Sequence, residues 1–345
     1  MREERLAVDR RQEQGLKLRR AMTGPRAGSR SDTLRRLMAF AGLIILFVGF
    51  SIASPYFFQF SNIVGILLAT SVNGLLALGA TFVIITGGID LSVGTVMTLS
   101  AVMSSVVVVR WGLPVGLGVV GGMITGTLAG IANGLMVAKM KIPPFVATLG
   151  TLYVAKGLAL VISELKPIYF TSAPSFAQIA MGSVTGAIFP GFDIPNAVLI
   201  LFATAVIAHF VLTKTILGRY TFALGSNEEA ARLSGVVVDL WKVMVYAVGG
   251  LFAGLGGVVM AARLNSAQPA LGAGYELDAI AAVVIGGTSL DGGEGSILGT
   301  IIGAFIISVL TNGLRIMSVP QEWQIVVTGI IVVLTVYMDT VRRRE

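Results

Sequence analysis

The sequence predicts an all-α membrane protein with about ten transmembrane helices, and three observations lead to this class. Of the 345 residues, 55% are hydrophobic and 12% are charged, whereas a soluble domain has about 25% charged residues. The mean hydropathy is +0.86. A chain this apolar has more apolar surface than the core of one soluble domain can bury. The long apolar runs lack the period of two that marks a transmembrane β-strand, so they are expected to be helices.

A helix needs about 20 apolar residues to cross the hydrocarbon layer of a membrane. Ten runs approach or reach that length: Leu37–Ala53, Ile63–Thr86, Leu91–Val109, Leu113–Ala138, Phe145–Ser163, Ile194–Thr213, Lys242–Ala262, Leu277–Ser289, Ser296–Leu314 and Glu322–Asp339. The eighth run is short and the first is marginal. We therefore expect one membrane domain over residues 37–340, with a basic, disordered tail at 1–36 and a short terminus at 341–345.

Positive charge predicts the orientation of these spans. Eleven of the 25 Lys and Arg residues lie in the first 36 positions, and Arg342, Arg343 and Arg344 lie at the end. With both termini placed in the cytoplasm, the inside loops and C-terminus carry nine basic residues and the outside loops four, as the positive-inside rule expects. On a membrane protein such a tail favours contact with anionic lipid over nucleic acid. The longest inside loop is 214–241.

Side chains for metal or thiol chemistry are scarce. The chain has no cysteine and one histidine, which excludes disulfides and Cys metal sites and predicts no resident metal. The glycines are more informative, because small residues let membrane helices approach closely. The ladder Gly118, Gly122, Gly126 and Gly130 is expected to pack one helix against another.

Two Gly-Gly pairs interrupt apolar runs at places where no long loop follows. The first, Gly87-Gly88, comes shortly before Asp90 and Ser92, either of which can cap the next helix. The second is Gly286-Gly287. Paired helix breaks in two halves of a transporter often mark a solute pathway, whereas the alternative is an ordinary cytoplasmic turn. Asn133-Gly134-Leu135 is echoed by Asn312-Gly313-Leu314, which indicates an internal repeat whose intervals differ.

The inside loop contains a further helix signal. Ser226 and Glu229 have the spacing of a capping box, and Gly235 suits a helix C-terminus. A helix of about two turns is too short and polar to span, and it is marginal in water unless it packs on another surface. A partner protein is one such surface, and the lipid or the protein's own loops are another.

At this point the chain resembles the permeases of ATP-binding-cassette (ABC) importers. The stretch Glu229-Ala230-Ala231 with Gly235 is similar to their EAA loop. The stretches 86–94 (Thr-Gly-Gly-Ile-Asp-Leu-Ser-Val-Gly) and 144–150 (Pro-Phe-Val-Ala-Thr-Leu-Gly) resemble the ribose/xylose/galactose-type branch. The likeness covers about residues 37–340, and the Arg-rich tail lies outside it.

The resemblance implies a permease subunit in the bacterial inner membrane that conducts a monosaccharide and is not itself an enzyme. It implies a second permease copy or similar chain, a cytoplasmic ATPase that binds ATP and Mg, and a periplasmic sugar-binding protein. Docking of the ATPase is carried over to residues of loop 214–241: Gly218, Arg219, Glu228, Glu229, Ala230, Ala231 and Gly235. The chain has no phosphate-binding Gly-Lys-Ser/Thr loop of its own.

A sugar pathway requires neutral hydrogen-bonding groups that bind weakly. Our candidates are Asn73, Thr86, Asp90, Ser92, Asn133 and Asn312. Three other classes stay open. A branched-chain amino-acid ABC permease would need countercharges for a zwitterion. An ion-coupled transporter would need ionisable groups at mid-membrane, for which only Asp90 and Lys156 are available. A membrane scaffold would leave the paired breaks unexplained.

Overall fold

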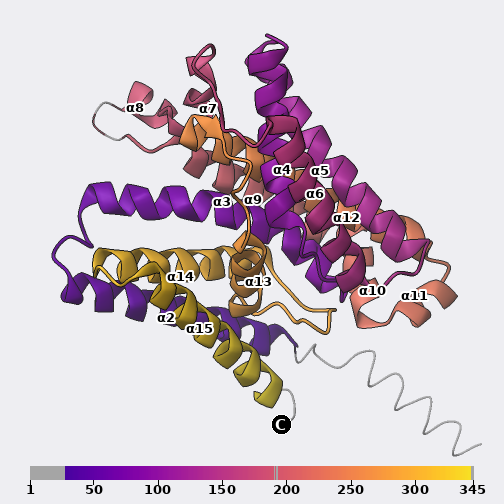
Figure 1. Cartoon of the computed structure of the whole chain (residues 1–345). Helices are drawn as coiled ribbons and strands as arrows, with labels where there is room; N and C mark the ends of the chain where they lie inside the picture. Colours follow the sequence, from indigo (N-terminus) through magenta and orange to yellow (C-terminus); the bar gives the residue numbers. More distant parts are fainter. Residues whose placement is uncertain (1–27, 190, 192, 343–345) are drawn as a thin grey trace, which may run out of the picture.

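The protein folds into a bundle of helices with almost no strand, as the sequence predicts. The computed structural model describes residues 28–189, 191 and 193–342 (Figure 1). The long elements are α2 (Gly28–Ala53), α3 (Phe60–Ile85), α4 (Val93–Ser105) with its π-helical end η1 (Val106–Arg110), α5 (Val115–Ala138), α6 (Pro144–Ser163), α9 (Asn196–Lys214), α12 (Val238–Leu264), α14 (Ile297–Ile316) and α15 (Gln321–Arg342). The short ones are β1 (Ile168–Tyr169), η2 (Pro174–Phe176), α7 (Gln178–Met181), α8 (Val184–Ile188), α10 (Ile216–Ser226), α11 (Glu228–Leu233), β2 (Ser266–Ala267) and α13 (Tyr275–Ile285).

Each of the ten predicted spans overlaps a helix, which confirms the all-α membrane class. Among the described residues, seven helices are long and apolar enough to cross a membrane, and α2 carries a shorter apolar stretch over Leu37–Ala53. The eighth predicted span, Leu277–Ser289, is wrong as a span. Its helix α13 has 11 residues, about 16 Å at 1.5 Å per residue, roughly half of the hydrocarbon thickness.

The N-terminal boundary also differs from the prediction. Helix α2 begins at Gly28, inside the segment 1–36 that we expected to be disordered. Residues 1–27, which carry most of the predicted basic tail, lie outside the described residues, as do residues 343–345.

The core of the bundle is formed by α3, α4, α12 and α14. In the apolar window of α4, 83% of the residues are buried, against 22% in α5 and α6. Large apolar side chains such as Leu128, Tyr153 and Val206 are exposed on the outer helices, which suits contact with lipid tails. In Figure 1, α3 and α14 run side by side, and α13 lies next to both.

Glycines bring α5 and α12 together, as the ladder predicted. A Cβ atom on Gly126 would lie 2.6 Å from the Gly254 nitrogen, and one on Gly130 would overlap the Tyr246 carbonyl. A Cβ atom on Gly134 would lie 2.6 Å from the Val243 Cα atom. The two backbones therefore meet without side chains between them over several turns.

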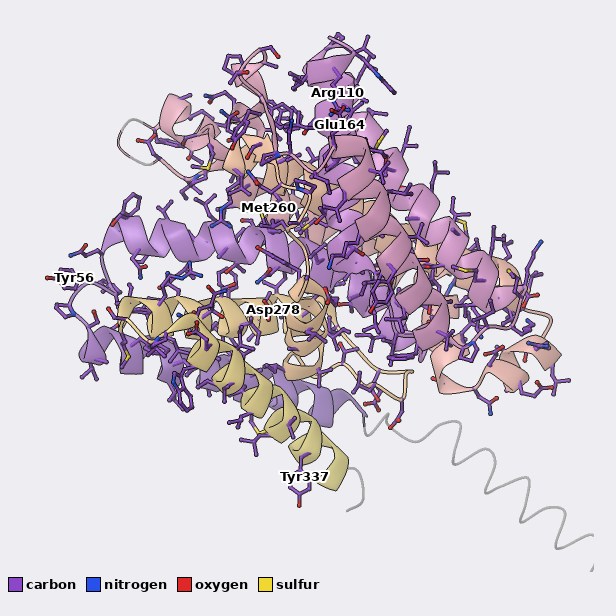
Figure 2. The ribbon with its side chains drawn as sticks, in the orientation of Figure 1. Tyr56, Arg110, Glu164, Met260, Asp278 and Tyr337 are labelled. Carbon is purple, nitrogen blue, oxygen red and sulfur yellow. The ribbon has the colours of Figure 1, made fainter. Side chains whose placement is uncertain are left out.

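The two ends of the bundle have different structures. At one end, Arg110 forms an ion pair with Glu164 at 3.2 Å (Figure 2). Strand β1, which follows Glu164, pairs antiparallel with β2. The opposite end carries α10 and α11 (Figure 1), which belong to the predicted inside loop. The predicted docking segment therefore projects from the end of the molecule opposite to the Arg110–Glu164 pair.

Candidate functional site

The first Gly-Gly pair ends α3 through a Schellman motif. The Gly88 N–H donates to the Val83 carbonyl (3.1 Å) and the Gly87 N–H to the Ile84 carbonyl (2.8 Å). Gly87 has a φ of +74°, a conformation that favours glycine at this position of the motif. The sequence predicted this break correctly.

The second pair ends α13 with the same hydrogen bonds. Thr288 donates to the Val283 carbonyl (3.1 Å) and Gly287 to the Val284 carbonyl (2.9 Å), and the φ of Gly287 is +90°. Both helices thus end with the same hydrogen-bond pattern, which supports an internal repeat of the two helix breaks.

Behind the first break, Asp90, Ser92 and Asn133 form a buried polar network. The Asp90 Oδ1 atom accepts from the Ser92 backbone N–H (2.8 Å) and from its hydroxyl (2.6 Å). The Asn133 side-chain amide donates to the Ser92 Oγ atom (2.9 Å), and Thr151 donates to the Asn133 Oδ1 atom. The network links the break to α5 and α6, and all of its members except Thr151 are at most 4% exposed.

This geometry corrects the predicted helix cap. Ser92 occupies the N-cap position of α4 but its side chain caps no helical N–H, because its hydroxyl is bound to Asp90. The three pathway candidates are brought together, yet they are buried. Their role as pathway residues stays a prediction.

The other pathway candidates lie apart from this network. The Thr86 hydroxyl donates to the Val83 carbonyl (2.7 Å), so it closes the last turn of α3. Asn73 lies on α3 and Asn312 on α14, and the Oδ1 atom of each is buried without a hydrogen-bond partner among the described residues. Amide oxygens of this kind are costly to bury unpaired, which keeps both residues as candidates for binding a polar solute.

The predicted cytoplasmic helix exists, but its cap is one residue later than expected. Helix α11 is capped by Asn227, whose Oδ1 atom accepts from the Ala230 N–H (2.9 Å). Ser226 is the last residue of α10, so the predicted capping box is wrong. Gly235 ends α11 with a φ of +85°, as predicted.

The predicted docking residues divide into an exposed set and an inward set. Arg219, Glu229, Ala230 and Gly235 are exposed. Ala231 is 7% exposed and packs with Leu224 and Val238. Gly218 is buried against the Leu212 carbonyl, and Glu228 forms ion pairs with Arg232 (3.1 Å) and Lys242 (2.6 Å). The inward set holds the segment in place, while the exposed set can contact another protein.

Sequence reasoning missed two carboxylates, because Glu276 and Asp278 looked like ordinary first-turn residues of a span. A Cβ atom on Gly303 would overlap the Ala282 carbonyl, so α13 runs along α14 and its first turn lies near the middle of that helix. Figure 2 places Asp278 near the centre of the molecule. The Glu276 carboxylate accepts from the Gly274 N–H (3.1 Å), whereas the Asp278 carboxylate makes no hydrogen bond or ion pair with the described residues.

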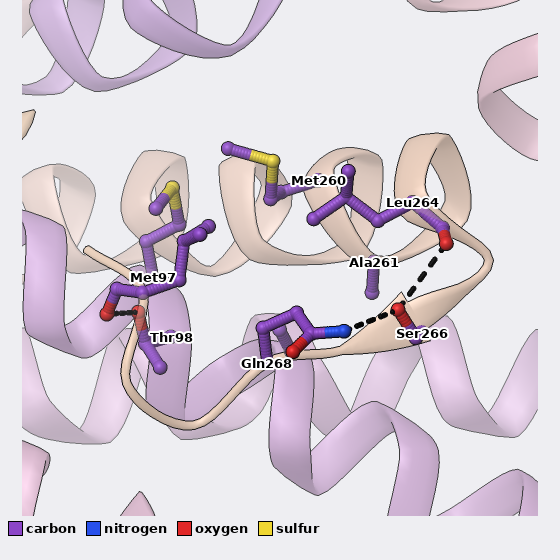
Figure 3. A pocket seen from close by; sticks show the side chains of 9 residues that line it. Met97, Thr98, Met260, Ala261, Leu264, Ser266 and Gln268 are labelled. Atoms are coloured by element: carbon purple, nitrogen blue, oxygen red, sulfur yellow. Dashed lines mark hydrogen bonds between the residues drawn. The ribbon is translucent and has the colours of Figure 1, made fainter. Parts of the chain in front are cut away.

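A small cavity lies between α4, α12 and the segment that follows α12 (Figure 3). Its polar lining comes from Thr98, Ser266 and Gln268. Thr98 donates to the Leu271 carbonyl (2.6 Å), and Gln268 donates to the Ser266 Oγ atom (2.9 Å). The cavity is too small for a monosaccharide. The proline and glycines after α12 were the available sequence signal for this irregular segment.

Comparison with known proteins decides the family. The profile described as "Branched-chain amino acid transport system / permease component" matches residues 62–336. The chain belongs to this permease family. The match begins within α3 and ends within α15, so the family region of this permease contains both Gly-Gly breaks and the α10–α11 segment.

Curated relatives match most of the permease. It is 44% identical over 307 residues to the ribose import permease protein RbsC of Bacillus subtilis, covering 89% of this chain and 93% of the relative. It is 41% identical to RbsC of Escherichia coli, covering 91% and 97%. It is 32% identical to the xylose transport system permease protein XylH of Escherichia coli, covering 96% and 98%. No solved structure matches significantly. The permease is a transport component and not an enzyme.

Proposed function

We propose that the permease conducts a monosaccharide, such as a ribose-like pentose, a hexose or a related polyol, as the membrane subunit of an ABC importer. The observation that carries this proposal is the identity of 41–44% to proteins named ribose import permeases, over more than nine-tenths of their length. The network of Asp90, Ser92 and Asn133 and the amides of Asn73 and Asn312 supply hydrogen-bonding groups that form no ion pair with a cation in the part of the chain that the structure describes, which suits a neutral polyhydroxylated solute.

We place the complex in the bacterial inner membrane, with both termini in the cytoplasm. A second copy of the permease or a similar chain completes the pathway, and a periplasmic sugar-binding protein delivers the solute. The cytoplasmic ATPase binds ATP and Mg and docks on the exposed side of α11. The exposed Glu229 and Ala230 and the apolar Leu233, which is 81% exposed, offer a mixed polar and apolar contact of the kind that protein interfaces use.

The deciding experiment is transport by the reconstituted complex. The permease, its ATPase and its binding protein are placed in liposomes, and uptake of radiolabelled ribose, xylose and galactose is measured with and without internal ATP. We expect uptake of at least one sugar that depends on ATP and on the binding protein. ATP-independent uptake that follows a proton gradient would instead establish an ion-coupled transporter.

The family description keeps branched-chain amino acids as the second candidate, although the curated relatives named above are sugar permeases. A zwitterion needs a countercharge of each sign along its route. An excess of unlabelled leucine in the same assay separates the candidates, because it leaves sugar uptake unchanged under our proposal. Saturable ATP-driven leucine uptake without sugar uptake would overturn the sugar assignment.

A further inference from the structure

Three segments that are distant in sequence meet at the cytoplasmic-loop end of the bundle. They are the end of α3, the loop after α13 and the joint between α10 and α11. The Ile85 carbonyl, one of the last carbonyls of α3, accepts a hydrogen bond from the Gly293 N–H (2.8 Å). The last carbonyls of a helix have no partner within the helix. Here the loop that follows the second Gly-Gly break supplies one.

The α10–α11 joint packs against the two residues that form this hydrogen bond. A Cβ atom on Gly225 would overlap both the Ile85 carbonyl oxygen and the Gly293 nitrogen. A Cβ atom on Gly293 would lie 2.8 Å from the Ser226 Oγ atom, and one on Gly292 would lie 2.8 Å from the Gly87 nitrogen. Such distances leave no room for a side chain, so the joint contacts the end of α3 at the first break and the loop that follows the second break.

The joint is also fixed to α11 and to α12. Leu224 of α10, Ala231 of α11 and Val238 of α12 form one buried apolar cluster. The rings of Tyr220 and Trp241 lie 4.8 Å apart, and the Glu228–Lys242 ion pair joins α11 to α12. Since close-packed contacts are stiff, a displacement of α11 moves the joint with it.

We propose that this junction of Gly225, Ile85 and Gly293 transmits displacement of α11 at once to the first Gly-Gly break and to the loop that follows the second. The proposal rests on the proposed function, because it takes the ATPase to dock on α11. Gly225 is then a positioning residue for coupled transport. Its role is to let the docking segment contact the end of α3 and the loop after α13 directly, because it has no side chain to separate them.

The first test is Gly225→Ala, with Gly157→Ala as its matched control. Both glycines are helical, but nothing lies within 4 Å of a Cβ atom on Gly157. In the reconstituted importer we expect the Gly225 variant to purify with the ATPase and to hydrolyse ATP, while sugar uptake per ATP falls about tenfold. The control is expected to transport as the wild type does. Wild-type uptake per ATP in the Gly225 variant would overturn the proposal.

A second variant weakens the packing of the same joint without introducing a steric clash. Leu224 is 3% exposed, so Leu224→Ala leaves a cavity beneath the joint, and Leu158→Ala on α6 is its exposed counterpart. We expect Leu224→Ala to lower sugar uptake per ATP while the ATPase remains bound. If the Gly225 variant does not fold, this second variant is the test of the junction. Unchanged coupling in Leu224→Ala contradicts the junction. A wild-type permease that neither binds the ATPase nor transports sugar would refute the proposed function instead.

Discussion

The side-chain amide of Asn133 donates to the hydroxyl oxygen of Ser92 at 2.9 Å, and this contact ties α5 to the helix break that follows α3. The same amide lies 3.5 Å from each Asp90 carboxylate oxygen. A side chain of α5 therefore completes a hydrogen-bonded turn that local sequence builds only in part.

Replacement of Asp90 separates its structural role from its transport role. Asp90→Leu removes the acceptor of two Ser92 donors, and a buried donor without an acceptor costs about 1–3 kcal/mol. We expect a clear loss of thermal stability in the detergent-purified permease. Asp90→Asn keeps an acceptor oxygen and should fold normally. If Asp90→Asn also takes up sugar at the wild-type rate with its ATPase bound, Asp90 serves only to shape the turn.

Two adjacent glutamates on α11 are expected to respond differently to substitution. Glu229 is exposed, whereas Glu228 is held by Arg232 and Lys242. Glu229→Arg should abolish ATPase co-purification and ATP-driven uptake while the permease stays monodisperse, because it reverses a charge on the proposed contact surface. Glu228→Gln is the control, because it weakens ion pairs made within the chain. Normal ATPase binding by Glu229→Arg would remove Glu229 from the docking surface.

Hydropathy and glycine patterns predicted the helices and their breaks, because both depend on local sequence. The start of α11 was misplaced because Ser226 and Asn227 are both good caps. The choice falls to Asn227 since α10 continues through Ser226, which lies against Gly293. Helix α10 itself was missed within the predicted inside loop, although Leu217, Thr221 and Leu224 recur at helical spacing.

The depth of α13 could not be predicted from its composition. Its 11 helical residues are as apolar as a span, so the run was extended through Gly286-Gly287 to Ser289. The contact of Gly303 with the Ala282 carbonyl places the start of α13 beside the middle of α14. The two residues are 21 positions apart, and the local sequence does not encode the path of the loop between them. The central position of Asp278 follows from this tertiary contact alone.

Enlarging Gly126 should separate α5 from α12. Its Cβ atom would lie 2.6 Å from the Gly254 nitrogen and nearer still to the Gly250 carbonyl oxygen, so Gly126→Ala forces two backbones apart. We expect a loss of about 1–3 kcal/mol in stability from overpacking, seen as a lower unfolding temperature in detergent. Gly150→Ala on α6 meets nothing within 4 Å and should leave that temperature unchanged or raise it. Equal temperatures for the two variants would contradict close α5–α12 packing.

Asp278 provides a test of where the solute passes. Carboxylates within a membrane domain face protein or a wet space and not lipid. The Asp278 carboxylate is partly exposed and has no hydrogen-bond or ion-pair partner among the described residues. A carboxylate accepts strong hydrogen bonds from sugar hydroxyls, so Asp278→Leu should lower sugar uptake about tenfold with the ATPase still bound. Sugar uptake by Asp278→Asn should lie between that of the wild type and that of Asp278→Leu. Leu277→Ala, at the neighbouring exposed position, controls for a general disturbance of α13. Equal uptake by Asp278→Leu and Leu277→Ala would exclude Asp278 from the route of the solute.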